Sequence, residues 1–100
     1  MRYEEIESLD RPQVAYLYLI SQIKLFKETL DKVTLYSKKN SAGHLYTSIT
    51  TYLADTKDSL HTVNFKFFDD EYLWFLNALS IDFPDAPLED LREQEGNDGT

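Results

Sequence analysis

Apolar side chains recur at helical spacing in the first segment of the chain, which opens at Asp10-Arg11-Pro12. They follow one another at intervals of 3, 4, 3, 4 and 3 residues: Tyr16, Leu19, Ile23, Phe26, Leu30 and Val33. This heptad spacing predicts a long helix. Asp10 can cap its first turn, and proline is tolerated there because its missing N–H would be unpaired. We expect the helix to end at Lys38-Lys39, where cations suit the negative end of the helix dipole.

A second segment with the same spacing follows a short break at residues 40–43. Its seam positions are Tyr46, Ile49, Leu53, Thr56, Leu60 and Val63. The pattern predicts a second helix, antiparallel to the first because the connection is short. Many of its residues are β-branched, which lowers intrinsic helicity, so packing against the first helix would have to hold it.

A third helix is predicted to run to about Ser80, with Asp69 as N-cap and with Asp70 and Glu71 in the first turn, where acids complement the dipole. Residues 64–68 are interpreted as a turn or short extended link. Prolines break the chain at residues 84 and 87, and a last short helix is expected over 87–93. The first nine residues are expected to add one helical turn.

These elements predict an all-α fold: a small helical bundle built on a long antiparallel helical hairpin, with a third aromatic-rich helix and short terminal helices. Residues 1–94 would form one helical domain, because about 100 residues suit a single core. Residues 95–100, rich in glycine and acids, are predicted to be a disordered acidic tail.

Charge is unevenly distributed along the chain, whose net charge is -8. Residues 67–100 carry ten acidic groups against Arg92 alone, whereas residues 11–66 carry eight basic groups against four acidic ones. The acidic third either folds against the basic middle and keeps the protein soluble, or forms a negative surface for a basic partner. Direct binding of nucleic acid is disfavoured, because the whole-molecule field would repel phosphates.

The third helix is apolar on every side, which is typical of a helix buried on every side. Trp74 and its neighbours are therefore either core or a contact surface of the hot-spot type. The residues predicted to bind a partner are Phe67, Phe68, Asp69, Asp70, Glu71, Trp74, Phe75, Asp82 and Asp85. On the first helix, Leu17 is expected to pack inside the bundle, whereas Tyr18 and Leu25 are assigned to a dimer face.

Little in the sequence points to catalysis. The chain has no cysteine and only two histidines, His44 and His61, which are expected at the surface or at a helix end and lie too far apart to share a metal. The run Asp69-Asp70-Glu71 lacks the spacing of a calcium loop, and no nucleophile motif or phosphate-binding glycine loop is present. We therefore expect no enzymatic activity, no catalytic residues, no cofactor and no metal.

The longest apolar run, residues 14–20, is too short to span a membrane, and the acidic N-terminus lacks the apolar stretch of a secretory signal. We expect a cytoplasmic protein–protein interaction module, such as an adaptor, chaperone, immunity factor or inhibitor. One alternative is an acidic nucleic-acid mimic that blocks a DNA- or RNA-binding protein. Others are a purely structural homodimer subunit and a bundle with a small-molecule pocket between its helices.

Overall fold

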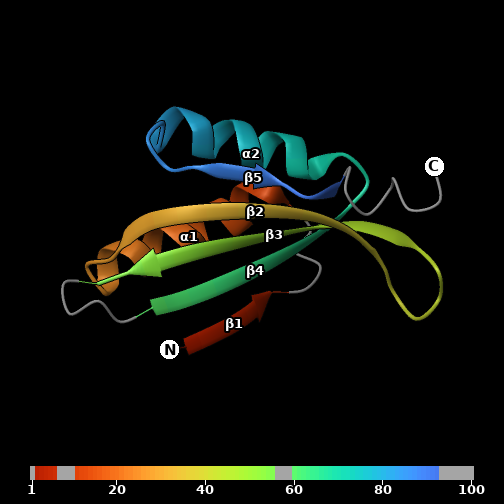
Figure 1. Cartoon of the computed structure of the whole chain (residues 1–100), viewed down its shortest axis with the longest axis horizontal. Helices are drawn as coiled ribbons and strands as arrows, with labels where there is room; N and C mark the ends of the chain where they lie inside the picture. Colours follow the sequence, from red (N-terminus) through yellow and green to blue (C-terminus); the bar gives the residue numbers. More distant parts are fainter. Residues whose placement is uncertain (1, 7–10, 56–59, 93–100) are drawn as a thin grey trace.

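Two helices pack against one face of a β-sheet in the computed structural model (Figure 1). The structure describes residues 2–6, 11–55 and 60–92, and the side chains of residues 11–55 and 60–92. In chain order the elements are β1 (Arg2–Ile6), α1 (Pro12–Leu25), β2 (Thr29–Lys39), β3 (Leu45–Ala54), β4 (Leu60–Phe68), α2 (Glu71–Asp82) and β5 (Leu88–Asp90).

The strand order in the sheet of the described residues is β1-β4-β3-β2-β5. The strands β2, β3 and β4 form an antiparallel meander, while β1 pairs with β4 and β5 pairs with β2 in parallel. The segments β1-α1-β2 and β4-α2-β5 are therefore crossovers between parallel strands, which need a long connection such as a helix. Both helices lie on the same side of the sheet as a result (Figure 1).

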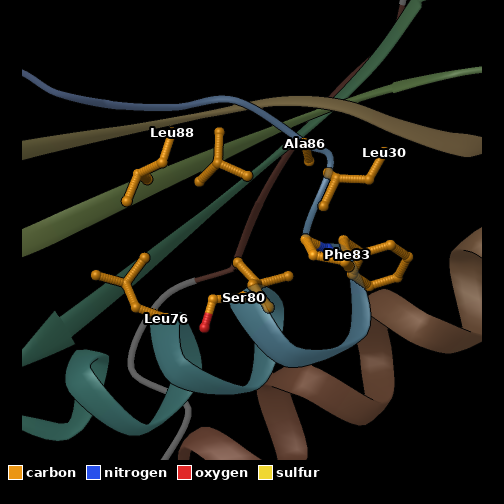
Figure 2. A pocket seen from close by; sticks show the side chains of 9 residues that line it. Leu30, Leu76, Ser80, Phe83, Ala86 and Leu88 are labelled. Carbon is orange, nitrogen blue, oxygen red and sulfur yellow. The ribbon is translucent and has the colours of Figure 1, made fainter.

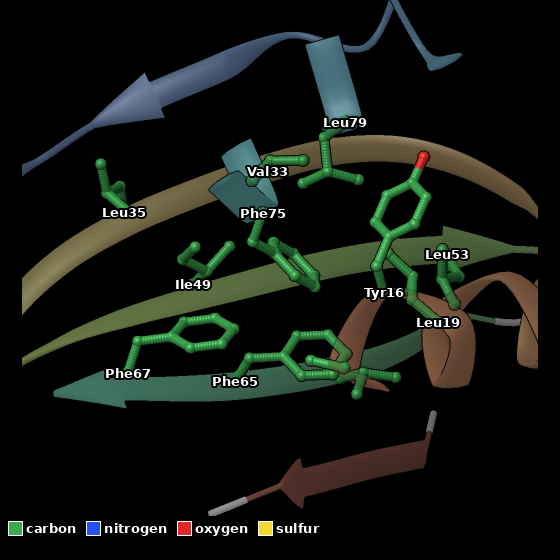
Figure 3. Packing of buried hydrophobic residues seen from close by; sticks show 12 residues of the cluster. Tyr16, Leu19, Val33, Leu35, Ile49, Leu53, Phe65, Phe67, Phe75 and Leu79 are labelled. Carbon is green, nitrogen blue, oxygen red and sulfur yellow. The ribbon is translucent and has the colours of Figure 1, made fainter. Parts of the chain in front are cut away.

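The hydrophobic core lies between this sheet face and the helices. Register places Leu35, Ile49 and Phe65 side by side across β2, β3 and β4. Successive strand residues point to opposite faces, so alternate residues on each strand share the core. The ring of Phe75 from α2 lies 4.9 Å from that of Phe65 and 5.3 Å from that of Phe67, measured between centroids. Figure 3 shows this aromatic cluster beside Leu79 and Tyr16.

The all-α prediction is wrong, and so is the helical bundle. The first helix ends at Leu25 rather than at residue 39, and β2, β3 and residues 60–63 of β4 occupy segments that were predicted to be helical. Residues 64–68, interpreted as a turn or short extended link, are the rest of β4. On β3, Thr47 and Thr51 are buried on the same face as Ile49 and Leu53. Counting these threonines as polar hides the two-residue period of the strand and leaves the helical spacing visible. The β-branched residues that would weaken a helix favour the strand instead.

Of the remaining predictions about secondary structure, some are confirmed and others are wrong. The start of the first helix at Pro12, the break at residues 40–43 and the third helix are confirmed, although α2 runs from Glu71 to Asp82. The helices expected at 87–93 and in the first nine residues are wrong, because Leu88–Asp90 and Arg2–Ile6 are strands. The predicted cap Asp10, seam residue Thr56 and the tail 95–100 lie outside the described residues.

A buried contact between Glu28 and His61 joins the end of α1 to β4. Lys27 adopts a left-handed conformation (φ 52°) and ends the helix, which turns Glu28 inward. The Nδ1 atom of His61 lies 3.1 Å from Oε1 and 3.3 Å from Oε2 of Glu28, and each side chain is 1% exposed. His61 is therefore a core residue, and its predicted surface position is wrong; His44 is exposed as expected.

We predict that Glu28→Ala lowers the free energy of unfolding by about 1–3 kcal/mol, because it leaves the buried imidazole without its hydrogen-bonded carboxylate. Glu89→Ala is the matched control, since its contact with Lys32 is about half exposed and should contribute no more than about 1 kcal/mol. Urea denaturation of both variants gives the comparison. Equal losses for the two variants would contradict a structural role for the buried pair.

Candidate interaction face on the helical layer

The helices carry most of the exposed apolar surface of the described chain. Of nine large hydrophobic side chains that are exposed, six belong to the two helices: Val14, Leu17, Leu25, Leu73, Trp74 and Ile81. We call these six the helix-layer face. Three of them, Leu17, Leu25 and Ile81, are 67–71% exposed. Large apolar side chains left exposed on one layer of a fold are typical of contact surfaces.

Both helices are apolar on two sides, and the sheet covers only one. On α2, Phe75 and Leu79 are buried against the strands, while Leu73 and Ile81 point the other way at helical spacing. On α1, Ala15 and Leu19 are fully buried in the same core. A helix in a chain with a single core needs only one apolar stripe. The second stripe on each helix therefore exceeds what the described fold buries.

Trp74 lies between core and solvent. It is 43% exposed, and its ring meets the ring of Tyr16 edge to face, 6.0 Å apart and at 84°. Tyr16 in turn meets the buried Phe75 at 5.8 Å. The core thus fixes the orientation of the indole without covering it, which is the arrangement of a preorganised aromatic anchor.

The aromatic residues that were predicted to bind a partner lie in three different places in the structure. Phe67 and Phe75 are buried in the core, so their assignment to a contact surface is corrected. Phe68 lies on the opposite face of the sheet, with its ring 5.8 Å from that of Tyr46. Trp74 alone among the four remains on the helix-layer face. The alternation within β4 separates Phe67 from Phe68.

On α1, Leu17 and Tyr18 have each other's expected position. Leu17, expected inside the bundle, is 67% exposed. Tyr18, assigned to a dimer face, is half-buried, and its ring lies 6.5 Å from that of Phe65. Leu25 is exposed, as its assignment to that face requires. The sheet layer, which the sequence pattern did not predict, supplies the surface that covers Tyr18.

Charged groups divide the helical layer into two halves. The α2 half has five exposed acids, three before or at its start and two at its end: Asp69, Asp70, Glu71, Asp82 and Asp85. The α1 half has three exposed cations: Arg11, Lys24 and Lys27. Asp69 has a positive φ of 62° and forms the sharp turn into α2, while Asp70 occupies the N-cap position that was predicted for Asp69.

A tyrosine–carboxylate hydrogen bond holds the two helices together beneath this surface. The hydroxyl of Tyr16 on α1 donates to the carboxylate of Asp82 on α2 and lies 3.2 Å from the carbonyl oxygen of Ala78. Burial, this hydrogen bond and the negative charge of Asp82 raise the pKa of Tyr16 well above its usual range. Ionising Tyr16 would place two negative oxygens against each other.

The other face of the sheet has a different chemistry, which the sequence interpretation missed. Three lysine ammonium groups lie over tyrosine rings there, 5.4–5.8 Å from the ring centroids: Lys32 over Tyr52, Lys38 over Tyr36 and Lys66 over Tyr46. The residues between them, such as Ser48 and Asn64, are polar and hydrogen-bonded to each other. We call this the sheet face. Alternation of Tyr, Ser and Thr along 45–54 was its sequence signal.

The described residues contain no group of three or more histidine, aspartate or glutamate side chains placed to hold a metal ion. Neither described helix is long and apolar enough to cross a membrane. No family model, curated protein or solved structure matches the chain.

We predict that stability falls at high pH because of Tyr16. Its folded-state pKa is raised, so the folded protein retains the phenolic proton that the unfolded chain loses above pH ~10. The contribution is complete below that pH and is lost as pH rises, by about 1 kcal/mol near pH 11. Urea denaturation from pH 8 to 11 should give a flatter profile for Tyr16→Phe than for the wild type. Parallel profiles would contradict this account.

Proposed function

We propose that this chain is a small acidic protein–protein interaction module that docks on a partner protein through the helix-layer face. The observation that carries the proposal is the second apolar stripe of α2, with Leu73, Trp74 and Ile81 exposed between two sets of acidic residues. Apolar anchors supply affinity when they are desolvated at the centre of an interface. Acids around them raise the association rate of a basic partner and reject an acidic one.

The distribution of the acids favours this proposal over an acidic nucleic-acid mimic. Carboxylates stand at the two ends of α2, while the surface between them holds exposed Leu73, Trp74 and Asn77. A mimic binds through charge, so its affinity would fall steeply with salt. An interface centred on an indole and aliphatic groups depends on salt mainly at its rim.

A homodimer is the second candidate, and the charge division of the helical layer favours it. A two-fold axis could place the α1 half of one copy, with Lys24 and Lys27, against the acidic α2 half of the other. Such an interface would bury the same six apolar residues. This candidate differs from the first in needing no second kind of chain, so the oligomeric state separates the two.

We also propose that the module has no enzymatic activity of its own and acts in the cytoplasm. Support for the first point is the composition of the helix-layer face, whose six described residues are aliphatic or aromatic and do not act as nucleophiles or bases. Support for the second comes from composition, because a chain without cysteine does not rely on disulfides.

To test docking, immobilised wild type and Trp74→Ala/Ile81→Ala are compared for capture of proteins from a nuclease-treated lysate of the source organism, at low and high salt. We expect one protein retained at both salts by the wild type and reduced at least about tenfold by the variant, since losing two anchors exceeds ~1.4 kcal/mol. Tyr36→Ala/Lys38→Ala on the sheet face is the control and should retain it.

Sedimentation of the same proteins decides between the candidates. A wild-type monomer is expected under the proposal, whereas a dimer that Trp74→Ala/Ile81→Ala dissociates supports the second candidate. Capture that is lost at high salt and unaffected by the two substitutions would overturn docking through aromatic anchors. Loss of capture in the sheet-face control alone would show that the partner binds the sheet face and would overturn the proposal.

A further inference from the structure

An apolar cavity of about 270 Å³ lies between α2, β2 and the link that leads to β5. It is lined by Leu30 of β2, Leu76 of α2, Phe83 in the link and Leu88 at the start of β5, and Figure 2 shows these side chains together. The only hydroxyl in the lining belongs to Ser80, and it donates to the carbonyl oxygen of Asn77 at 2.8 Å. The cavity therefore favours an apolar occupant. A cavity of ~150 Å³ can hold a benzene ring, so this one has room for a large apolar side chain.

The cavity reaches the surface at its rim, because Leu88 is 54% exposed and Ser80 and Pro84 are also exposed. Ile81 of the helix-layer face follows Ser80 on the same helix. A chain docked along α2 can thus place one side chain in the cavity while it continues over the helix-layer face.

A second hollow of about 320 Å³ adjoins the cavity at Phe83 and Pro84, which line both. Its lining includes the exposed acids Asp82 and Asp85, and none of its lining residues is basic. Glu28 also lines it, but its carboxylate is bound to His61 and is not free to meet an occupant. An occupant of the apolar cavity therefore has an acidic hollow directly beside it. Charge complementarity favours a cation as the occupant of the second hollow.

The negative charges of Asp82 and Asp85 are unfavourable at the C-terminal end of α2. The C-terminal end of a helix is negative and is stabilised by cations; α1 obeys this rule with Lys24 in its last turn. The last turn of α2 has no basic residue; it ends at Asp82, and Asp85 follows three residues later. Residues that break a local rule of stability in this way are often functional.

The described residues do not fully neutralise the carboxylates of Asp82 and Asp85. Arg92, the sole basic residue of 67–100, is bound to Asp90 at 2.9 Å and to the hydroxyl of Tyr72 at 2.7 Å. Tyr16 donates a neutral hydrogen bond to Asp82. Asp85 has no hydrogen bond or ion pair with any described residue. A cation supplied from outside would relieve this local excess of negative charge.

We propose that this place in the fold recognises two neighbouring side chains of the partner protein: a large apolar one in the cavity and an arginine or lysine at Asp82 and Asp85. Arginine suits the site best, because its guanidinium can bridge two carboxylates with a fixed fork of donors. This inference rests on the proposed function and specifies the partner as a protein with an apolar–basic segment.

The direct test uses short capped peptides and a nitrogen-15 NMR titration of the full chain. The probe is Gly-Ser-Leu-Arg-Gly-Ser, with Gly-Ser-Ser-Arg-Gly-Ser and Gly-Ser-Leu-Gln-Gly-Ser as controls. We expect the probe to shift the backbone amides of Ser80, Phe83, Ala86 and Leu88 and to bind at least fivefold more tightly than either control. Equal binding by all three peptides, or shifts confined to the sheet face, would overturn the inference.

Two substitutions separate the parts of the site. Asp85→Asn removes one carboxylate and should weaken the probe at least fivefold, while the urea midpoint stays the same or rises because an acid leaves the negative helix end. Asp69→Asn, at the other end of α2, is the matched control and should leave probe binding unchanged. Ala86→Leu fills space in both hollows and should abolish the shifts in a protein that retains its fold. Probe binding that is indifferent to Asp85→Asn and Ala86→Leu would refute the site.

Failure of this inference is distinguishable from failure of the proposed function. If Trp74→Ala/Ile81→Ala loses the captured partner while Asp85→Asn and Ala86→Leu retain it, the helix-layer face is the interface and the cavity is not part of it. If none of these variants loses the partner, docking through the helical layer is itself wrong.

Discussion

The packing of Phe75 from α2 onto Phe65 and Phe67 of β4 determines how the rest of the molecule is arranged. These rings lie 4.9 and 5.3 Å from that of Phe75 and belong to the fully buried core. Once Phe75 is fixed there, the neighbouring Trp74 is directed toward Tyr16 and solvent, and Leu73 faces away from the sheet. The same contact orients the end of α2, where Asp82 reaches Tyr16. The core thus decides which apolar side chains the protein presents outside.

Several features of the outer surface lower the stability of the isolated chain. Six large apolar groups on the helices remain exposed, and two acids stand at the negative end of α2. Folded proteins have a small margin of stability, so features of this kind persist most readily where they have a use. A partner that buries the apolar groups and brings a cation to the end of α2 would relieve both. One bound partner would thus remove both unfavourable features, which connects the proposed interface with the adjoining cavity.

The sequence predicted where the two helices begin and did not predict the sheet, and particular residues explain why. Pro12 and the acids at 69–71 are local signals, and both helices begin where those signals stand. The helical spacing over Tyr46–Val63 gave a wrong prediction because Thr47 and Thr51 are buried beside Ile49 and Leu53. Their burial depends on the pairing of β3 with β2 and β4. Tertiary pairing overrode the spacing, as it commonly does for β-branched segments.

The candidate site was predictable in kind and not in detail. Exposed Trp74 and the acids at 69–71, 82 and 85 follow from an apolar helix in an acidic segment. The cavity does not, because Leu30 and Leu88 meet α2 only after β2 and β5 pair. Burial of Glu28 against His61 likewise requires β4 to pass beneath the end of α1. Contacts between residues distant in the sequence leave no local signal.

The central claim is that the helical layer, and not the sheet face, contacts the partner. Photo-crosslinking in the source cells addresses it most directly, with a photoreactive amino acid placed at Ile81 in one variant and at Lys38 in another; both side chains are exposed and neither position is in the core. The account predicts a discrete crosslinked protein from position 81 and none from position 38. Crosslinks from position 38 alone would contradict it.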